Sequence, residues 1–284
     1  MRLRLSATEL GDVRLVLAGA GHHGPLLELT GGYCAAVYAG TGFVARIRKE
    51  PEPLRGMLHA RYLAWSQLCP VAVATLSGPV QVGELTVTVY ERAHPVGWVD
   101  GQALGAALRA VHDTPLAVVS TLPPALVLSS ALHTLTEPAA VAALSRRERT
   151  ELDAQLRAAA DQLVGPAVVS HGDCWPKSWV CTSAGPRLID PDTAGPSPAL
   201  HDLSMLVVGL APGPHHDPTF PTVDIAALAD GYGIAVAALH PAATIARGHN
   251  ISWALDEVRD RPGDHAGALA DLHYFATGRP PQTC

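Results

Sequence analysis

Residues 168–203 constrain this chain more than any other stretch of it. They hold two aspartates, Asp173 and Asp190, each downstream of a short apolar run. Between the aspartates, a strand candidate at 179–181 and a turn at 183–186 predict a hairpin. Such a hairpin puts one carboxylate in a loop and brings the second back beside it. Phosphoryl transfer uses this arrangement, because one carboxylate orients or deprotonates the attacking hydroxyl and another holds the magnesium that bridges the nucleotide phosphates.

The residues around these aspartates resemble the aminoglycoside phosphotransferase family, which includes choline-kinase-like enzymes and is distantly related to the protein kinases. The positions that carry the resemblance are His171-Gly172-Asp173, Ile189-Asp190, Gly195 and Asp202-Leu203. The match is close over this stretch and loose over most of the chain. It implies an α+β, two-lobed protein-kinase-like fold, with a small antiparallel-sheet N-lobe, a mainly helical C-lobe and a cleft between the lobes.

The hydrophobic pattern agrees with two lobes. We expect residues 1–93 to form a nucleotide-binding lobe, and residues 94–284 to form a catalytic and acceptor-binding lobe. Alternating apolar and polar residues predict strands, and apolar residues spaced by three and four predict helices. The elements expected in the first lobe are strands within 26–49, at 71–76 and at 86–90, and a helix at 54–68.

Helical periodicity dominates the second lobe. The helices expected there lie at 102–112, 138–163, 199–206, 225–232, 242–257 and 266–277. Pro138 suits the first position of its helix, because the N–H that proline lacks would be unpaired there. Gly165 and Pro166 are a stop signal for the same helix. Residues 211–222 are expected to form a loop.

Asp173 is the expected catalytic base, since a carboxylate near the acceptor hydroxyl can position it and take its proton late in the reaction. His171 completes the expected catalytic pair by bonding the loop backbone or another carboxylate and so fixing Asp173. Asp190 is the expected Mg²⁺ ligand, because Mg²⁺ takes a few carboxylate oxygens together with phosphates and waters. Asp192 is a second metal candidate that a turn explains equally well. The resemblance implies that Asp202 braces the catalytic loop.

One position departs from the resembling family. The family usually has an asparagine, a magnesium ligand, five residues beyond the loop aspartate, and this chain has Ser178 there. A serine oxygen can also coordinate magnesium, so Ser178 stays a metal-ligand candidate. Transfer could run through a water bridge, run on a single metal, or be lost so that only binding remains. The neighbouring Lys177 could contact a phosphate or be an ordinary exposed lysine.

The first lobe should bind the phosphates of the nucleotide. Backbone N–H groups of Gly31, Gly32 and Tyr33 could line an anion-binding concavity, although Gly-Gly is also common in hairpin turns. Arg46 stands on the expected third strand, where kinases have a lysine that contacts the α and β phosphates. Arginine offers a fork of donors to phosphate. No obvious glutamate on the following helix pairs with Arg46.

Two further sites are expected, for the base and for the acceptor. Backbone groups of Glu91 and Ala93, at the connection between the lobes, would meet the nucleotide base without distinguishing ATP from GTP. Trp253, Asp256 and Glu257 would face a cationic acceptor, because the resembling family uses acidic and aromatic residues in this region. A solvated acidic helix end is the alternative.

Composition excludes some partners. The net charge of −6 gives no basic surplus for nucleic acid. No apolar run approaches the ~20 residues that cross a bilayer, so no membrane partner is expected. The five cysteines form neither a disulfide framework nor a zinc pattern, and reduced thiols in a cytoplasmic protein are the plain interpretation.

The sequence therefore predicts a phosphotransferase that moves the γ-phosphate of ATP or GTP, with Mg²⁺, to a hydroxyl of a small molecule. An antibiotic-like acceptor, such as a cationic aminoglycoside or a peptide antibiotic, is the most natural subclass, with resistance or self-protection as the role. A catalytically weakened, kinase-like binding or regulatory protein is the alternative, motivated by Ser178. A metal phosphohydrolase built on His171 and His201 is disfavoured, because the histidine spacing does not suit a metal pair.

Overall fold

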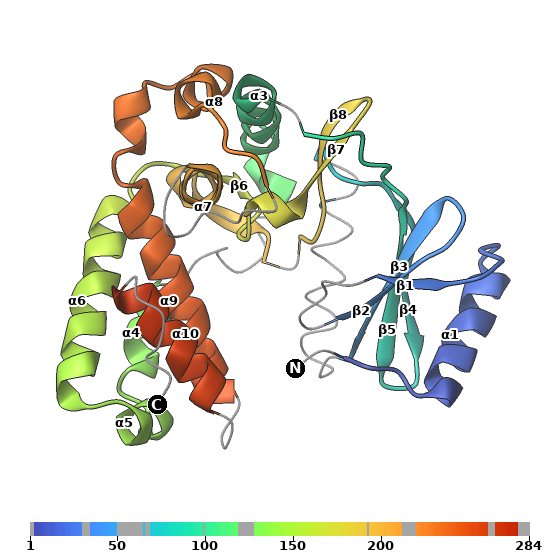
Figure 1. The fold of residues 1–284 in the computed structure, drawn as a ribbon, viewed down its shortest axis with the longest axis horizontal. Helices are drawn as coiled ribbons and strands as arrows, with labels where there is room; N and C mark the ends of the chain where they lie inside the picture. The colour runs from blue at the N-terminus through green and yellow to red at the C-terminus, as the bar shows by residue number, and fades with distance from the viewer. Residues whose placement is uncertain are drawn as a thin grey trace.

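The computed structural model of the chain describes residues 3–29, 35–49, 65, 69–98, 100–118, 128–191, 193–211, 220–260 and 265–277. These residues form two lobes, which lie side by side in Figure 1. One lobe is built on a five-stranded sheet, and the other is mainly helical with two small two-stranded sheets. The α+β class expected from the sequence is confirmed.

The N-lobe sheet is antiparallel. Its strands are β1 (Leu27–Leu29), β2 (Ala35–Ala39), β3 (Phe43–Lys49), β4 (Thr75–Val82) and β5 (Leu85–Glu91), in the spatial order β1-β2-β3-β5-β4. Buried and half-exposed residues alternate along β3, so Ala45 and Ile47 enter the core while Arg46 lies on the other face. The strands expected within 26–49 and at 86–90 are confirmed.

The bounds expected for the strand at 71–76 are wrong. The strand β4 begins at Thr75, and the residues before it are joined to the C-lobe instead. Val73 N–H donates to the carbonyl of Leu188 (3.1 Å), and Leu188 N–H donates to the carbonyl of Val71 (2.8 Å). β-branched residues favour any extended segment, so the pattern could not tell a sheet strand from this inter-lobe bridge.

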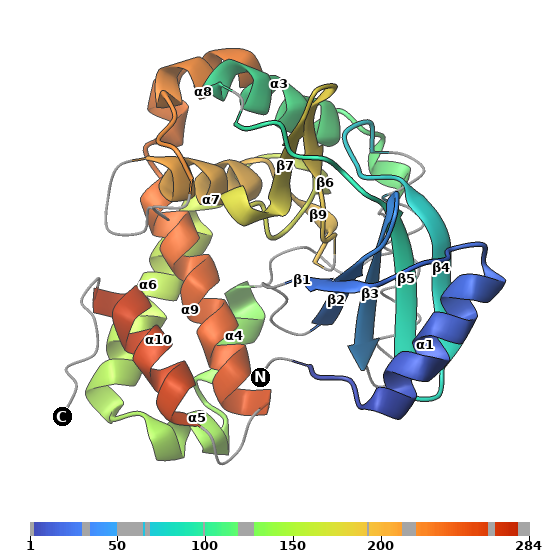
Figure 2. The same cartoon turned by 45° about the vertical axis from the view of Figure 1, so that its right-hand side comes forward.

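A helix that the sequence analysis did not assign, α1 (Ala7–Gly19), covers one side of the sheet (Figure 2). It begins with a capping box, in which Ser6 accepts from the N–H of Glu9 and the Glu9 carboxylate accepts from the N–H of Ser6. Val13 and Leu17 from this helix join the core of the sheet. The helix expected at 54–68 lies outside the described residues apart from Trp65, which is helical and buried.

The C-lobe consists of helices around two short strand pairs. The helices are α3 (Gly101–His112), α4 (Leu128–Thr134), α5 (Pro138–Ala143), α6 (Arg146–Gln162), α7 (Leu200–Leu210), α8 (Ile225–Tyr232), α9 (Ala242–Asp260) and α10 (His265–Thr277), and the strands are β6 (Ala167–Ser170), β7 (Trp179–Thr182), β8 (Gly185–Leu188) and β9 (Gly195–Pro198). The single helix expected at 138–163 is divided into α5 and α6. The first helix ends at Ala143 with an extended Leu144, and Ser145 caps the next helix through a second capping box with Glu148.

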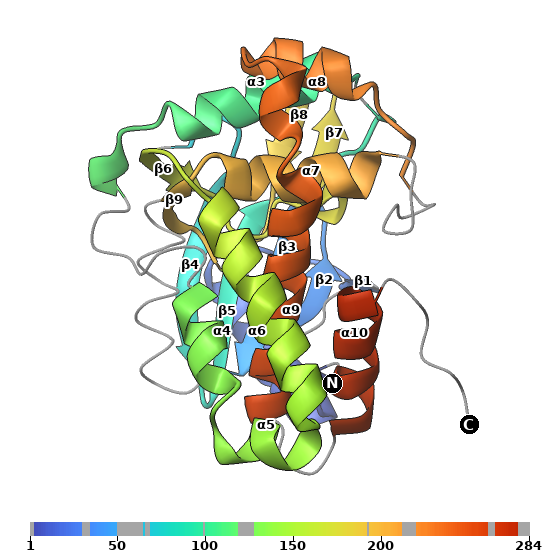
Figure 3. The same ribbon diagram turned by 90° about the vertical axis from the view of Figure 1, so that its left-hand side faces the viewer.

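The helices of the C-lobe pack in two cores. One gathers residues of α3, α7 and α8 around the strands, and the other gathers α4, α6, α9 and α10. Figure 3 shows α6, α9 and α10 beside one another, with α7 crossing above them. Helices α3 and α8 approach so closely that a Cβ atom on Gly105 would lie 2.1 Å from the carbonyl oxygen of Leu228.

Among the described residues, no single helix is long and apolar enough to cross a membrane. The helices at Ile225–Tyr232 and Val236–Arg259 meet that criterion of length and composition only when taken together, and they are bent by 105°.

Candidate active site

The expected hairpin is present, and the two aspartates flank it. β6 pairs with β9, and β7 pairs with β8, both antiparallel. The loop between β6 and β7 contains Asp173 and a short 3-10 turn, Pro176–Ser178. Asp190 follows β8 by two residues. The hairpin thus returns the second carboxylate toward the loop that holds the first.

A third carboxylate, Asp202 on α7, holds the start of this loop. It is fully buried and accepts hydrogen bonds from the N–H of His171 (2.7 Å), the N–H of Gly172 (2.9 Å) and the hydroxyl of Ser170 (2.9 Å). On its other side lies Nε2 of His112, at 3.1 Å. These contacts confirm the expected bracing role of Asp202.

The same contacts keep Asp202 ionised. Burial alone would raise its pKa, but the hydrogen bond from His112 and the nearby histidine rings outweigh that effect and hold the pKa below its ordinary value. A buried carboxylate with this many donors is stable as an anion. The loop is therefore built around a permanent negative charge.

Gly172 is required by the geometry of the loop. Its φ of +80° lies in the left-handed region, which side chains other than glycine rarely adopt. A Cβ atom there would also lie 2.5 Å from the carbonyl oxygen of Thr193. The glycine of the His-Gly-Asp motif thus serves both the turn and the close contact with Thr193, which precedes β9.

His171 fixes the loop through its ring, as expected. Its Nε2 lies 2.8 Å from the carbonyl oxygen of Ile189, and its Nδ1 accepts from the N–H of Asp173 at 3.3 Å. A carbonyl can only accept, so Nε2 carries the proton. Both ring nitrogens are therefore used by the backbone on either side of the site, which makes His171 a positioning residue for Asp173 and for the residue before Asp190.

Asp173 is partly exposed, with 29% of its side chain accessible. Its Oδ2 lies 3.5 Å from Nζ of Lys177, four residues further along the loop. The carboxylate is thus reachable from solvent while its backbone is held by His171. This is the arrangement expected of a group that meets a diffusible acceptor.

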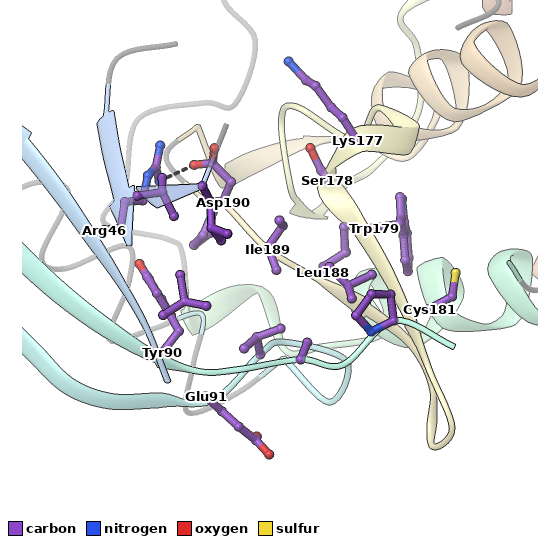
Figure 4. Close-up of a pocket in the computed structure, with 18 of the residues that line it drawn as sticks. Arg46, Tyr90, Glu91, Lys177, Ser178, Trp179, Cys181, Leu188, Ile189 and Asp190 are labelled. Atoms are coloured by element: carbon purple, nitrogen blue, oxygen red, sulfur yellow. Dashed lines mark hydrogen bonds and ion pairs between the residues drawn. The ribbon is translucent and has the colours of Figure 1, made fainter. Parts of the chain in front are cut away.

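Asp190 is in the left-handed region, with a φ of +68°, and is the one such residue other than glycine among those described. Aspartate tolerates this conformation better than most side chains do. Its Oδ1 forms an ion pair with the guanidinium of Arg46 on β3, which reaches across from the N-lobe (Figure 4). The expectation that Arg46 has no obvious partner is therefore corrected, since its partner comes from the other lobe and not from the following helix.

Ser178 lies beside these groups. Its hydroxyl donates to the carbonyl of Asp173 at 2.8 Å, and its N–H donates to the carbonyl of Trp175. The residue is nearly buried. Its hydroxyl hydrogen is thus committed to the loop, and only its oxygen lone pairs remain for a metal. The role of Ser178 as a ligand stays a prediction.

A cavity of about 860 Å³ lies between the lobes and brings several of the expected residues together. Arg46, Asp190, Ser178, Glu91 and Ala93 all line it. In Figure 4, Arg46 and Asp190 meet at one side of the cavity, with Ser178 beside them, while Glu91 lies on the opposite edge. The rest of the lining is largely apolar and includes residues of both lobes.

The described residues of the site supply only part of the coordination that a magnesium ion needs. Among the described residues, no three histidine, cysteine, aspartate or glutamate side chains gather as a complete metal site. Magnesium needs few protein ligands, however, because it keeps waters and binds substrate phosphates. Asp190, with 40% of its side chain exposed at the cavity, is a suitable carboxylate, and the Ser178 oxygen lies on the same lining.

The remaining site residues expected from the sequence are placed elsewhere. Gly31, Gly32 and Tyr33 lie outside the described residues, as does Asp192. Trp253, Asp256 and Glu257 lie on α9, away from the lining of the cavity. The carboxylate of Asp256 is paired with Arg259 at 2.9 Å. Their role toward an acceptor stays a prediction.

Sequence analysis missed two parts of the site. Trp98 and Phe220, whose rings lie 5.3 Å apart, form an aromatic wall of the cavity. Their two segments are distant in sequence and carry no motif. A chain of buried polar groups behind the loop was also missed, in which Tyr232 contacts His112 (2.7 Å) and His201 contacts His249 (3.2 Å). Burial lowers the pKa of His201 to about 3.

Comparison with known proteins finds solved structures of similar fold. A choline/ethanolamine kinase family protein from Mesorhizobium loti superimposes with a TM-score of 0.64, at 18% identity over 95% of each chain. A spectinomycin phosphotransferase, solved with ADP and spectinomycin, gives 0.62 at 15% identity, over 96% of this chain and 94% of that one. An amicoumacin kinase, solved with AMP-PNP and Ca²⁺, gives 0.62 at 15% identity over 97% of both chains.

At these identities the likeness shows the fold, which is the two-lobed protein-kinase-like fold. The comparison with curated proteins gave no match. The model of the phosphotransferase enzyme family matches residues 35–243, which is well over half of the chain. The chain therefore belongs to the phosphotransferase enzyme family.

Proposed function

We propose that this protein transfers the γ-phosphate of ATP or GTP to a hydroxyl group of a small molecule. The observation that carries this proposal is the ion pair between Arg46 and Asp190, which joins the two lobes at the cavity. Asp173, held by His171, lies on the adjoining loop. An arginine and a candidate metal ligand thus meet at one cleft, with a candidate base on the adjoining loop, and phosphoryl transfer uses these three groups.

The nucleotide would enter the cavity with its base toward the connection between the lobes. Val37 and Val44 from the sheet and Leu188 from the C-lobe offer apolar surfaces to the base. The N–H of Glu91 already donates to the carbonyl of Ala74 (2.8 Å), so the backbone at Ala93 is better placed to meet a base edge. Backbone recognition of this kind does not separate ATP from GTP.

Asp190, with the oxygen of Ser178, would hold Mg²⁺. The ion would neutralise charge on the phosphates and align them. Arg46 would keep Asp190 oriented and offer further N–H donors to phosphate oxygens.

Asp173 would accept the proton of the acceptor hydroxyl. The acceptor oxygen forms a bond to the γ-phosphorus while the bond from that phosphorus to the β–γ bridging oxygen breaks. The electron pair of the broken bond leaves with the nucleoside diphosphate, and the hydroxyl proton ends on the Asp173 carboxylate. His171 keeps the carboxylate in place without exchanging a proton.

An antibiotic-like, cationic acceptor is the most economical subclass. Two of the similar structures are named as a spectinomycin phosphotransferase and an amicoumacin kinase. In this chain, α9 carries Trp253, Asp256 and Glu257, an aromatic ring and two carboxylates that suit a cation. A role in antibiotic inactivation, carried out in the cytoplasm, follows from such an acceptor.

Calorimetric titration with ATP and GTP tests the proposal without knowledge of the acceptor. We expect binding in the presence of Mg²⁺ that weakens by at least roughly tenfold in EDTA or in the Asp190→Ala variant. No heat of binding with either nucleotide would overturn the phosphotransferase assignment. Binding that ignores both Mg²⁺ and Asp190 would instead favour the weakened, kinase-like binding protein.

A further inference from the structure

We propose that Lys177 is a catalytic residue that contacts the γ-phosphate during its transfer. This inference rests on the function proposed above. Lys177 lies in the short turn Pro176–Ser178, between the loop aspartate and the strand β7. The chain has one other lysine, Lys49, which lies at the far end of β3 and pairs with Glu84.

The first argument is position. Lys177 is part of the lining of the cavity, and its ammonium lies 3.5 Å from Oδ2 of Asp173. Asp173 itself lies just outside that lining among the described residues. A phosphoryl group that passes from a nucleotide in the cavity to a hydroxyl beside Asp173 must therefore move from the cavity toward the loop that holds Asp173. Lys177 connects the two places, because the residue lines the cavity and its ammonium contacts Asp173.

The second argument is charge. Among the described residues that line the cavity, Arg46 and Lys177 are the cationic side chains, and Glu91 and Asp190 are the acidic ones. Arg46 is already paired with Asp190. A polyanionic triphosphate would therefore meet a lining with little positive charge available to bind it. Of the two cationic side chains, Lys177 is the one beside Asp173, the proposed catalytic base.

The third argument concerns the neighbouring side chain. The hydroxyl of Ser178 donates its hydrogen to the carbonyl of Asp173, so Ser178 has no hydrogen to offer a phosphate oxygen. Lys177 has three N–H donors on a flexible stem, and 65% of its side chain is exposed. It can therefore swing from the carboxylate to a phosphate oxygen without disturbing the loop.

This movement has a consequence for the base. While the bond from phosphorus to the bridging oxygen breaks and the bond to the acceptor oxygen forms, the ammonium would follow the phosphoryl oxygens and stay protonated. Its departure from Asp173 leaves Oδ2 open to the acceptor proton, and the electron pair of the broken bond leaves with the nucleoside diphosphate. Lys177 would thus link two events: it neutralises charge on the phosphate, and by leaving Asp173 it makes that carboxylate available as the catalytic base.

Covalent labelling of lysine tests the proposal directly, because the chain carries only two lysines. The full chain is treated with a limiting amine-reactive acylating reagent, and the labelling of Lys177 and Lys49 is measured by peptide mass spectrometry. The reaction is run with Mg²⁺ alone, with Mg²⁺ and ADP, and with Mg²⁺ and the β,γ-imido analogue of ATP. Calorimetry under the same conditions fixes the saturation of each nucleotide.

At a nucleotide concentration about ten times its Kd, we expect the analogue to reduce labelling of Lys177 roughly tenfold. ADP, which lacks the γ-phosphate, should protect it little, and Lys49 should be labelled equally throughout. Saturation by the analogue without protection of Lys177 would overturn this inference and leave the proposed function standing. Failure of both nucleotides to bind would instead overturn the proposed function.

Variants give an independent measurement. The wild-type protein should bind the imido analogue more tightly than ADP, and Lys177→Met should lose about tenfold of that preference, as expected for one hydrogen bond to a charged group. Lys177→Arg should restore part of it. Lys49→Met is the matched control and should keep the full preference. A Lys177→Met variant that discriminates as the wild type does would contradict the assignment.

Discussion

Asp202 and Asp190 are both aspartates of one site, but they differ in burial and in hydrogen-bond partners. This difference separates the framework of the site from its reactive surface. Asp202 is fully buried and is held by two backbone N–H groups, a hydroxyl and an imidazole. Asp190 is 40% exposed, has a left-handed backbone and is paired with an arginine from the other lobe. A buried carboxylate with a full set of hydrogen-bond donors holds a loop in place, whereas a partly exposed carboxylate is available to a ligand.

The largest effect should come from removing the framework carboxylate. Asp202→Ala leaves the N–H groups of His171 and Gly172 buried without an acceptor, and it removes the partner of Nε2 of His112. We expect the free energy of unfolding to fall by about 3–5 kcal/mol. Urea unfolding followed by circular dichroism measures it. A loss below about 1 kcal/mol would mean that the loop does not depend on Asp202.

The next effect should come from Gly172→Ala. The substitution combines an unfavourable positive φ with a Cβ atom 2.5 Å from the carbonyl oxygen of Thr193. We expect a loss of about 2–4 kcal/mol in the free energy of unfolding. Gly165→Ala is a useful control, because it also has a positive φ but meets open space, and it should cost only the conformational part. Equal losses in the two variants would contradict the close contact.

A smaller effect should appear with pH. Burial lowers the pKa of His201 to about 3, so the folded protein leaves this ring neutral at a pH where the unfolded chain, with a pKa near ~6.5, binds a proton. The contribution of the neutral His201 ring to stability is complete above the unfolded pKa of ~6.5 and is lost as the pH falls toward 3. Between pH 7 and pH 5.5 the loss should be about 1 kcal/mol.

Denaturant unfolding at these two pH values measures the effect, and His201→Asn should reduce the difference. Asp202 stays ionised in this window, because its pKa is held below its ordinary value. A wild-type protein that becomes more stable at pH 5.5 would show that the buried histidine is protonated in the fold.

The smallest change in stability should come from Asp190→Asn. Asparagine tolerates the left-handed backbone as aspartate does, and the lost ion pair is partly exposed, so we expect less than about 1 kcal/mol. Binding of Mg²⁺ and nucleotide, in contrast, should weaken by roughly tenfold or more. A variant that unfolds as easily as Asp202→Ala would place Asp190 in the framework and erase the contrast between the two carboxylates.

Much of the framework could be predicted from the sequence. The His-Gly-Asp and Ile-Asp motifs flank one hairpin, so their spacing and the turn residues between them were sufficient to predict that Ile189 returns to the loop of His171. The role of Asp202 followed from the family resemblance of the same stretch. Local patterns also gave the helix at 225–232 with its bounds.

The parts that were missed depend on residues far apart in the chain. Arg46 and Asp190 are separated by 144 positions, and no local pattern announces an ion pair across two lobes. Trp98 and Phe220 meet for the same reason. The division at Ser145 was missed because the apolar periodicity continues across it, although the capping box with Glu148 was readable in the sequence. The acceptor residues on α9 and the boundary at residues 93–94 stay predictions.

The central claim is that Asp173 acts as the base of a phosphoryl transfer at this cleft. The most direct test measures the transfer of label from γ-labelled ATP or GTP to a panel of hydroxylated antibiotics and choline, by the wild type and by Asp173→Asn. We predict labelled product with the wild type and a loss of about 100-fold or more in the variant, with nucleotide binding unchanged by calorimetry. Equal transfer by Asp173→Asn would contradict the account.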